Sequence, residues 1–159
     1  MKINVNNLTN RLVMLVVVGI VVTGTLIGQD GKGGRLVGTW GAVVTIRDCN
    51  SGAALNTFAS IASFNQGGTT IGSTSGIPQA LRTPEHGIWR HISGHSYQFS
   101  FKSFNFNAAG VATGYSIVTH DLELDRGGDT YTSSGIAQFY LMNGTQVGQG
   151  CSDAVGTRF

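Results

Sequence analysis

Residues 96–124 read SYQFSFKSFNFNAAGVATGYSIVTHDLEL, and they carry the clearest secondary-structure signal in the chain. Polar and aromatic side chains alternate at the start, which places Tyr97, Phe99 and Phe101 on one face. Alternation with a period of two, among aromatic and β-branched residues, is typical of a β-strand with one buried face. The Asn-Ala-Ala-Gly segment in the middle is typical of a turn. The strands predicted here are 96–106 and 111–124.

Two further aromatic residues of the predicted strand 96–106, Phe104 and Phe106, lie in the opposite register to Tyr97, Phe99 and Phe101. A β-bulge inserts one extra residue into a strand and shifts its register in this way. We therefore expect a bulge near Lys102 and Ser103 that accounts for the change of face.

Strand-like segments recur outside this stretch at regular spacing, and no segment after the Gly-rich residues near position 30 has a helical period. Asn143-Gly144 is a strong signal for a two-residue hairpin. Both prolines fall within residues 76–85, which we expect to be the one long loop. The other predicted strands are 37–47, 55–64, 69–75, 87–92, 130–141 and 145–151. Eight sequential strands predict an all-β domain over residues 36–159, an eight-stranded antiparallel up-and-down barrel.

An uncharged apolar run at residues 12–28 follows Lys2 and Arg11. Its length lies between that of a signal-peptide core and that of a membrane-spanning helix. We expect residues 1–28 to contain a hydrophobic helix that is either a cleaved signal peptide or a retained membrane anchor. In both cases the positive flank places the barrel outside the cytoplasm, as a periplasmic or extracellular domain or a single-pass membrane-anchored one. The Gly-rich residues 29–35 are expected to be a flexible linker.

The charge pattern argues against nucleic acid as a partner. Only 11% of the residues are charged. The net charge of +2 comes from Lys2 and Arg11, because the other eight basic residues are matched by eight acidic ones. The chain after the apolar run is therefore near neutral and has no basic stripe that could neutralise phosphates.

The chain has two cysteines, Cys49 at the end of the first predicted strand and Cys151 in the last. The first and last strands of a closed barrel are neighbours, and exported proteins retain disulfides. We therefore expect a disulfide between them that closes a loop of about 100 residues. Two unrelated buried thiols are the alternative. A catalytic thiol is not expected, because neither cysteine has a sequence neighbour suited to activate it.

The segment Leu36-Val37-Gly38-Thr39-Trp40 opens the first predicted strand. It resembles the Gly-x-Trp start of the lipocalins and avidins, the calycin group, in which the tryptophan closes one barrel end beneath an arginine from a late strand. The resemblance implies a barrel-closing role for Trp40 and Arg158, with a cation–π contact between them. The mid-chain Thr-Asp-Tyr motif of the lipocalins is absent, so their ligand contacts do not carry over. The tail from Cys151 to Phe159 also resembles that of uncharacterised exported bacterial proteins, which supplies no activity.

The sequence contains no standard catalytic or metal-binding motif. His86, His91 and His95 are close in sequence, but their spacing matches no zinc site, and we expect them in surface turns. We therefore expect no metal and no cofactor, and the sequence does not favour an enzyme.

Titratable side chains lie on both faces of the predicted strand 111–124. Asp121, Glu123 and Asp125 occupy alternate positions, which is more typical of a solvated strand face than of acid–base catalysis. His120 is on the apolar face and is expected inside the barrel, either as a hydrogen-bonded core residue or as part of a ligand site.

Aromatic side chains inside a barrel either line an apolar pocket or fill a core. The residues predicted to bind a ligand are Tyr97, Phe99, Phe101, Tyr115 and His120. The first functional hypothesis is an extracytoplasmic barrel that binds a small apolar molecule, which requires a cavity open at one end.

Two other functions remain open. One is a membrane-anchored accessory subunit of a membrane protein complex, with a filled barrel and an exposed apolar patch. The other is a cyclase of the allene-oxide-cyclase type, which this architecture resembles. A cyclase requires a polar residue such as His120 or Tyr115 to face an apolar cavity.

Overall fold

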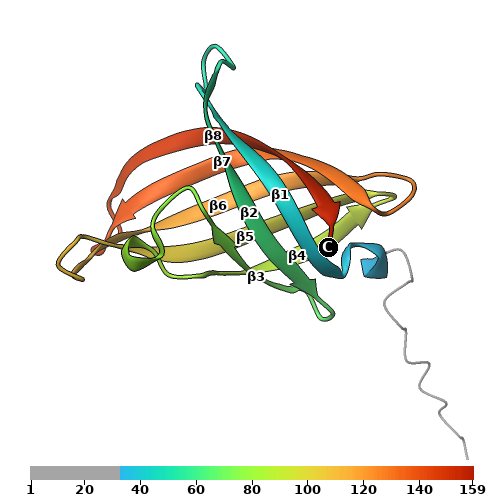
Figure 1. The fold of residues 1–159 in the computed structure, drawn as a ribbon, viewed down its shortest axis with the longest axis horizontal. Helices are drawn as coiled ribbons and strands as arrows, with labels where there is room; N and C mark the ends of the chain where they lie inside the picture. The colour runs from blue at the N-terminus through green and yellow to red at the C-terminus, as the bar shows by residue number, and fades with distance from the viewer. Residues whose placement is uncertain (1–32) are drawn as a thin grey trace, which may run out of the picture.

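The computed structural model describes residues 33–159, which form a closed barrel of eight strands arranged in sequence order. Neighbouring strands are antiparallel, and Figure 1 shows β1 and β2 crossing the others diagonally. The strands are β1 Gly38–Arg47, β2 Ala54–Asn65, β3 Thr69–Thr74, β4 Glu85–Ser93, β5 Ser96–Phe106, β6 Ala112–Leu124, β7 Thr130–Leu141 and β8 Gln146–Arg158. The two short 3-10 helices are η1 Gly33–Leu36 and η2 Gln79–Leu81.

The predicted all-β class and the closed eight-stranded antiparallel barrel are confirmed. Two strands extend beyond their predicted bounds by two residues or more at one end. β4 begins at Glu85, inside the expected loop, and β8 continues past Cys151 to Arg158. The hydrophobic helix predicted for residues 12–28 lies outside the described residues.

The prediction of a bulge near Lys102 and Ser103 is wrong. β5 pairs with β6 without interruption as far as Asn105, and the register shifts only after that residue. Phe104 stays on the outer face, where it is 40% exposed and its ring lies 5.2 Å from the Lys102 ammonium. The small Ser103 takes the inner position instead and is buried. The aromatic residues of β5 therefore occupy both faces of a regular strand.

One end of the barrel is closed by a packed aromatic core. Trp40, at the start of β1, is fully buried, and its ring meets Tyr131 edge-on at 5.2 Å between centroids. The indole N–H of Trp40 donates a 2.9 Å hydrogen bond to the Leu36 carbonyl oxygen, which holds η1 against the core. The other members of this core are Phe64, Trp89, Tyr97, Leu122 and Leu124.

Arg158, at the end of β8, joins several parts of the closed end. Its guanidinium carbon lies 4.3 Å from the Trp40 ring centroid, which is the cation–π geometry that the calycin resemblance implies. The same guanidinium donates hydrogen bonds of 3.0 Å to the Val37 carbonyl, 2.6 Å to the Arg35 carbonyl, and 2.8 and 3.0 Å to the Gly128 carbonyl. One side chain thus connects η1, β1 and the β6–β7 turn.

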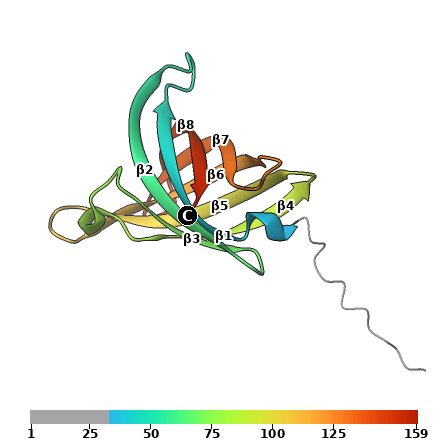
Figure 2. The ribbon, with the colours of Figure 1, turned by 45° about the vertical axis from the view of Figure 1, so that its right-hand side comes forward.

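The predicted disulfide between Cys49 and Cys151 is present, with Cα atoms 5.2 Å apart. It connects the β1–β2 hairpin to β8, at the point where Arg47 pairs with Cys151. Figure 2 shows this hairpin rising away from the rest of the barrel. A salt bridge between Arg47 and Asp153 lies beside the disulfide and adds a second connection between the same strands.

The expected linker, residues 29–35, overlaps the folded part of the chain. Residues from Gly33 onward form η1, and Leu36 at its end is fully buried. Arg35 contacts the opposite side of the closed end, where its Nη1 lies 3.1 Å from His95 Nε2. Within residues 33–159, no helix has the length and hydropathy needed to cross a bilayer.

Candidate ligand-binding cavity

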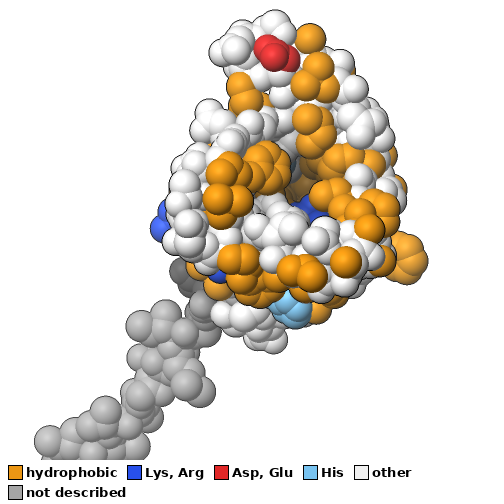
Figure 3. Space-filling model, turned by 90° about the vertical axis from the view of Figure 1, so that its left-hand side faces the viewer, with side chains coloured by type: hydrophobic (Ala, Val, Ile, Leu, Met, Phe, Trp, Pro, Cys, Tyr) orange, Lys and Arg blue, Asp and Glu red, His pale blue; other side chains and the backbone are white. Residues whose placement is uncertain are grey.

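The barrel contains a cavity at the end opposite Trp40, with a volume of about 270 Å³. Figure 3 looks at this end and shows a hollow surrounded by hydrophobic side chains. The walls come from the inward-facing positions of the strands and from the loop before η2. The apolar residues that form much of the wall are Val44, Phe58, Phe99, Phe101, Val118 and Phe139.

Strand alternation explains why these side chains meet. On β5 and β6, Phe101 is paired with Val118 and Phe99 with His120, and all four line the cavity. Residues two apart on a strand point to the same face, so each strand contributes a short column of side chains to the wall. Most of the cavity wall is therefore built on regular strands, and the segment around η2 completes it.

His120 and Ser152, which line the cavity, belong to a buried polar cluster with Ser133. The ring nitrogens of His120 lie 3.0 Å (Nδ1) from Ser133 Oγ and 2.9 Å (Nε2) from Ser152 Oγ. Burial lowers the pKa of His120 to about 4, although the carboxylates of Asp153 and Asp121 act to raise it. The ring is therefore neutral at pH 7, so one nitrogen donates to a serine and the other accepts from a serine.

Gly135 on β7 makes room for the imidazole. It pairs with His120 on one side and with Ser152 on the other. A Cβ atom at this position would lie 2.6 Å from His120 Cδ2 and 2.0 Å from the Thr119 carbonyl oxygen. Any side chain would force the ring away from its two serines, so the glycine fixes where the histidine can lie.

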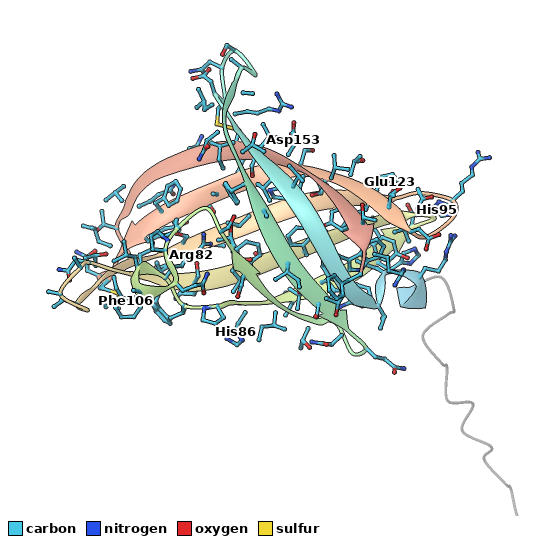
Figure 4. All side chains as sticks on the ribbon, viewed as in Figure 1. Arg82, His86, His95, Phe106, Glu123 and Asp153 are labelled. Carbon is cyan, nitrogen blue, oxygen red and sulfur yellow. A yellow bond between two sulfur atoms is a disulfide. The ribbon has the colours of Figure 1, made fainter. Side chains whose placement is uncertain are left out.

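A buried ion pair forms part of the same wall. Arg82 Nη2 lies 3.2 Å from Glu85 Oε1, and the two side chains are 11% and 8% exposed. The Nε of Arg82 also donates a 2.8 Å hydrogen bond to Ser103 Oγ. Burial raises the pKa of the Glu85 carboxyl, while the adjacent Arg82 acts to lower it. In Figure 4 Arg82 lies toward the same end of the barrel as Phe106.

Three of the five residues predicted to bind a ligand line the cavity, namely Phe99, Phe101 and His120. Binding by these residues stays a prediction. The cyclase hypothesis requires a polar side chain in an apolar cavity, and His120 has that position. Both of its ring nitrogens are already hydrogen-bonded, so a proton transfer to a ligand would have to break one of these bonds.

The two tyrosines of the predicted set lie elsewhere. Tyr97 belongs to the closed-end core, is 1% exposed, and its ring centroid is 6.0 Å from that of Trp89. Tyr115 faces outward, because the alternate positions of β6 face the cavity. Its ring stacks on Tyr140 at 5.0 Å, and the Lys102 ammonium lies 3.8 Å from its centroid. The structure therefore brings neither tyrosine to the cavity wall described above.

Apart from His120, the sequence does not predict the polar residues in and beside the cavity. Arg82 and Glu85 fall in the predicted loop, where charged side chains are normally solvated. No periodic pattern signals that such a loop folds inward. The inward position of Ser133 could have been predicted, because this residue shares a strand face with the apolar Tyr131. Ser152 was missed because the predicted eighth strand stopped one residue before it.

The remaining titratable candidates do not converge on the cavity. Figure 4 places His86 and His95 well apart, the first beneath the barrel and the second near η1. Asp121 and Glu123 are exposed, and Asp125 accepts hydrogen bonds from four backbone N–H groups of the turn that follows. Within residues 33–159, no three His, Cys, Asp or Glu side chains are grouped closely enough to hold a metal ion.

No protein-family model matches this chain, and no curated protein matches it. Among solved structures, the crystal structure of Rv2717c from M. tuberculosis is similar, with a TM-score of 0.39 and 12% sequence identity. The similarity covers 79% of this chain and 93% of that chain. This level of similarity is too low to transfer a function, and no family match supports the lipocalin-like resemblance.

Proposed function

We propose that this protein is an extracytoplasmic β-barrel that binds a small, mainly apolar ligand inside the barrel. The observation that carries the proposal is the cavity of about 270 Å³ between aromatic walls, open at one end and closed at the other by Trp40. Ligand pockets are typically concave and apolar with a few polar groups that fix orientation. Apolar walls with a small polar cluster at His120 have this composition.

The size of the cavity sets the size of the ligand. An apolar cavity of about 150 Å³ holds benzene, so 270 Å³ has room for roughly ten to twelve non-hydrogen atoms. Burial of an apolar molecule of this size contributes free energy in proportion to the area removed from water. Because most of the wall consists of regular strands, we expect a largely preformed site, in which little ordering entropy opposes binding.

A cavity-filling substitution tests the proposal. Ala137 on β7 lines the cavity, and the adjacent Ile136 is 40% exposed on the outer face. We expect the full-length protein to bind naphthalene in titration calorimetry. Ala137→Trp should weaken that binding at least tenfold, because the indole would occupy the ligand volume.

Ile136→Trp is the matched control and should leave binding unchanged, since it adds the same ring to the outside of the same strand. The near-ultraviolet circular dichroism of each variant reports whether the barrel has folded. Absence of naphthalene binding to the parent protein, or equal binding to both variants, would contradict an internal ligand site.

Export is the second part of the proposal. The apolar run after Lys2 and Arg11 supports it, and so does the Cys49–Cys151 disulfide, because such bonds persist mainly outside the cytoplasm. Intact-mass measurement on native membrane and soluble fractions tests it. A soluble form that lacks about 24 to 28 residues indicates signal removal, and a full-length form in the membrane indicates an anchor. Recovery of only a full-length cytoplasmic form with free thiols would contradict export.

A membrane-anchored accessory subunit is the second candidate, and the outer barrel face favours it. Several aliphatic side chains there are 43–68% exposed, namely Val43, Ile61, Ile71, Ile88, Ile92 and Val155. Val43, Ile92 and Val155 also line an open depression of about 650 Å³ on the outside of the barrel. A full-length membrane form that co-purifies with a fixed set of membrane proteins would support this candidate.

A further inference from the structure

The polar groups inside the cavity determine which ligand chemistry it accepts. This inference rests on the proposed ligand-binding function and specifies the class of ligand. Four titratable residues line the cavity in the described part of the chain, namely Arg82, Glu85, His120 and Tyr131. Burial raises the pKa of Tyr131 to about 12, so its phenol is neutral at pH 7 and adds no charge. Their charges and hydrogen bonds decide whether an anion, a cation or a neutral molecule is stabilised inside.

The ion pair leaves the cavity without a free positive charge. Arg82 and Glu85 lie 3.2 Å apart and are nearly inaccessible to water, so each neutralises the other. The Nε of Arg82 is occupied as well, by Ser103. A carboxylate ligand would lose its hydration and would add a second negative charge beside Glu85, which is unfavourable in a poorly solvated site.

The deep end of the cavity also disfavours an anion. His120 is held between two serine hydroxyls and carries no charge at neutral pH. The charged groups that act on the imidazole are the carboxylates of Asp121 and Asp153, which follow His120 and Ser152 in sequence. The cation beside them, Arg47, is paired with Asp153 in a salt bridge and is not free to bind an anion inside the cavity. An ammonium ligand would lose most of its hydration and would find few hydrogen-bond acceptors in return. Binding of a cation is therefore also unfavourable.

Ser152 suits a neutral polar group. A serine hydroxyl has one donor and two acceptor positions, and the contact with His120 Nε2 uses only one of them. When Nε2 carries the proton, the Ser152 O–H is available to a ligand carbonyl. When Nε2 is bare, Ser152 donates to the ring and its lone pairs are available to a ligand hydroxyl. A change of imidazole tautomer therefore lets the same site accept either group.

We propose that the cavity selects uncharged, mainly apolar ligands of about ten to twelve non-hydrogen atoms that carry one hydroxyl or carbonyl group, and that Ser152 binds this group with His120 as its positioning partner. The phenylalanine walls contact the apolar body of the ligand. The Arg82–Glu85 pair excludes a free carboxylate and stays intact when the ligand binds.

A series of ten-carbon compounds tests this proposal by titration calorimetry on the full-length protein at pH 7. The probes are decane, 1-decanol, 2-decanone, decanoate and decylammonium. We expect 1-decanol and 2-decanone to bind at least tenfold more tightly than decanoate and decylammonium. Relative to decane, the extra hydrogen bond should strengthen binding about two- to tenfold.

Variants of Ser152 identify the group that makes this hydrogen bond. Ser152→Ala should reduce the affinity for 1-decanol to that for decane and leave decane binding unchanged. Ser152→Thr keeps the hydroxyl and should retain the preference, which tests the role even where the alanine variant folds poorly. Ser134→Ala, which removes an exposed hydroxyl from the outer face of β7, is the control and should change nothing.

The outcomes separate this inference from the proposed function. Tightest binding of decanoate or decylammonium, or equal affinities across the series, would overturn the ligand class while internal binding of naphthalene still stood. Retention of the alcohol preference in Ser152→Ala would overturn the role of Ser152. Failure of all five compounds and of naphthalene to bind would overturn the proposed function itself, and this inference with it.

Discussion

At the scale of single residues, His120 shows how a polar group is accommodated inside this barrel. It is 4% exposed, yet both ring nitrogens have hydrogen-bond partners, so the ring does not carry the full desolvation penalty of an unsatisfied group. The protonated ring would need an acceptor at both nitrogens and would place a charge in a poorly solvated site. Burial therefore holds the pKa of His120 near 4.

This pKa predicts a specific dependence of stability on pH. The imidazole pKa is about 4 in the folded protein against an ordinary value of 6.5, so between these values the unfolded chain binds a proton that the folded chain does not. The contribution of His120 to folding is therefore complete above pH 6.5 and is lost as the pH falls toward 4. The loss should reach about 3 kcal/mol near pH 4. Urea unfolding at pH 7 and pH 5 measures the part that is lost by pH 5, about 2 kcal/mol.

His120→Gln is the control for this prediction, because glutamine can hydrogen-bond to a serine and does not titrate. We expect the fall in unfolding free energy between pH 7 and pH 5 to be clearly smaller in this variant than in the parent protein. An equal fall in both proteins would show that the acid sensitivity comes from other groups.

At the scale of the strands, the Cys49–Cys151 disulfide cross-links the two ends of the sheet where the barrel closes. It joins residues 102 apart in sequence, and it links the hairpin after β1 to β8. The chain-entropy treatment gives about 5 kcal/mol for a loop of this length, because the cross-link restricts the unfolded chain. We expect the Cys49→Ser/Cys151→Ser double variant to be less stable by about this amount in urea unfolding.

Reductant provides the internal control for the disulfide. It should destabilise the parent protein and have no effect on the double variant. The urea dependence should also be steeper without the cross-link, since the unfolded state becomes less compact and exposes more surface. Equal stabilities of the parent and the double variant would contradict a role for the disulfide in stability.

The strands show how much of this fold the sequence predicts. Regular alternation and the Asn143-Gly144 turn are local signals, and they place β5, β6 and β7 within a residue or two. The second half of β8 was missed because its inner positions are small. Gly156 is one of them, and a Cβ atom there would lie 2.1 Å from the Tyr131 ring. The glycine is required by a neighbour on another strand, which no local pattern reports.

The candidate site was less predictable than the fold, for a similar reason. The alternation on β5 and β6 correctly assigns Phe99, Phe101 and His120 to the inner face. It cannot show that Arg82 turns into the barrel from a loop, because that position depends on the partner Glu85 and on space left by other strands. Contacts between distant segments are set by the closed barrel as a whole.

At the scale of the whole molecule, the two barrel ends have different physical roles. The closed end combines a buried aromatic core with the cation–π contact and hydrogen bonds of Arg158. The other end holds the cavity, where side chains such as Phe139 are partly exposed and lack close packing on one side. Stability is therefore expected to reside mainly at the Trp40 end, and ligand binding at the other.

Two alanine substitutions test this division. Trp40→Ala removes a fully buried ring together with its hydrogen bond to Leu36, and should lower the unfolding free energy by about 3 to 5 kcal/mol. Phe139 is 39% exposed, so Phe139→Ala should cost about 1 kcal/mol while it weakens naphthalene binding. Urea unfolding and titration calorimetry on both variants measure the two effects. A loss of stability in Phe139→Ala as large as that in Trp40→Ala would contradict the assignment of stability to the Trp40 end. Unchanged ligand affinity in Phe139→Ala would contradict the assignment of binding to the other end, because removal of a wall ring must remove contacts to the ligand.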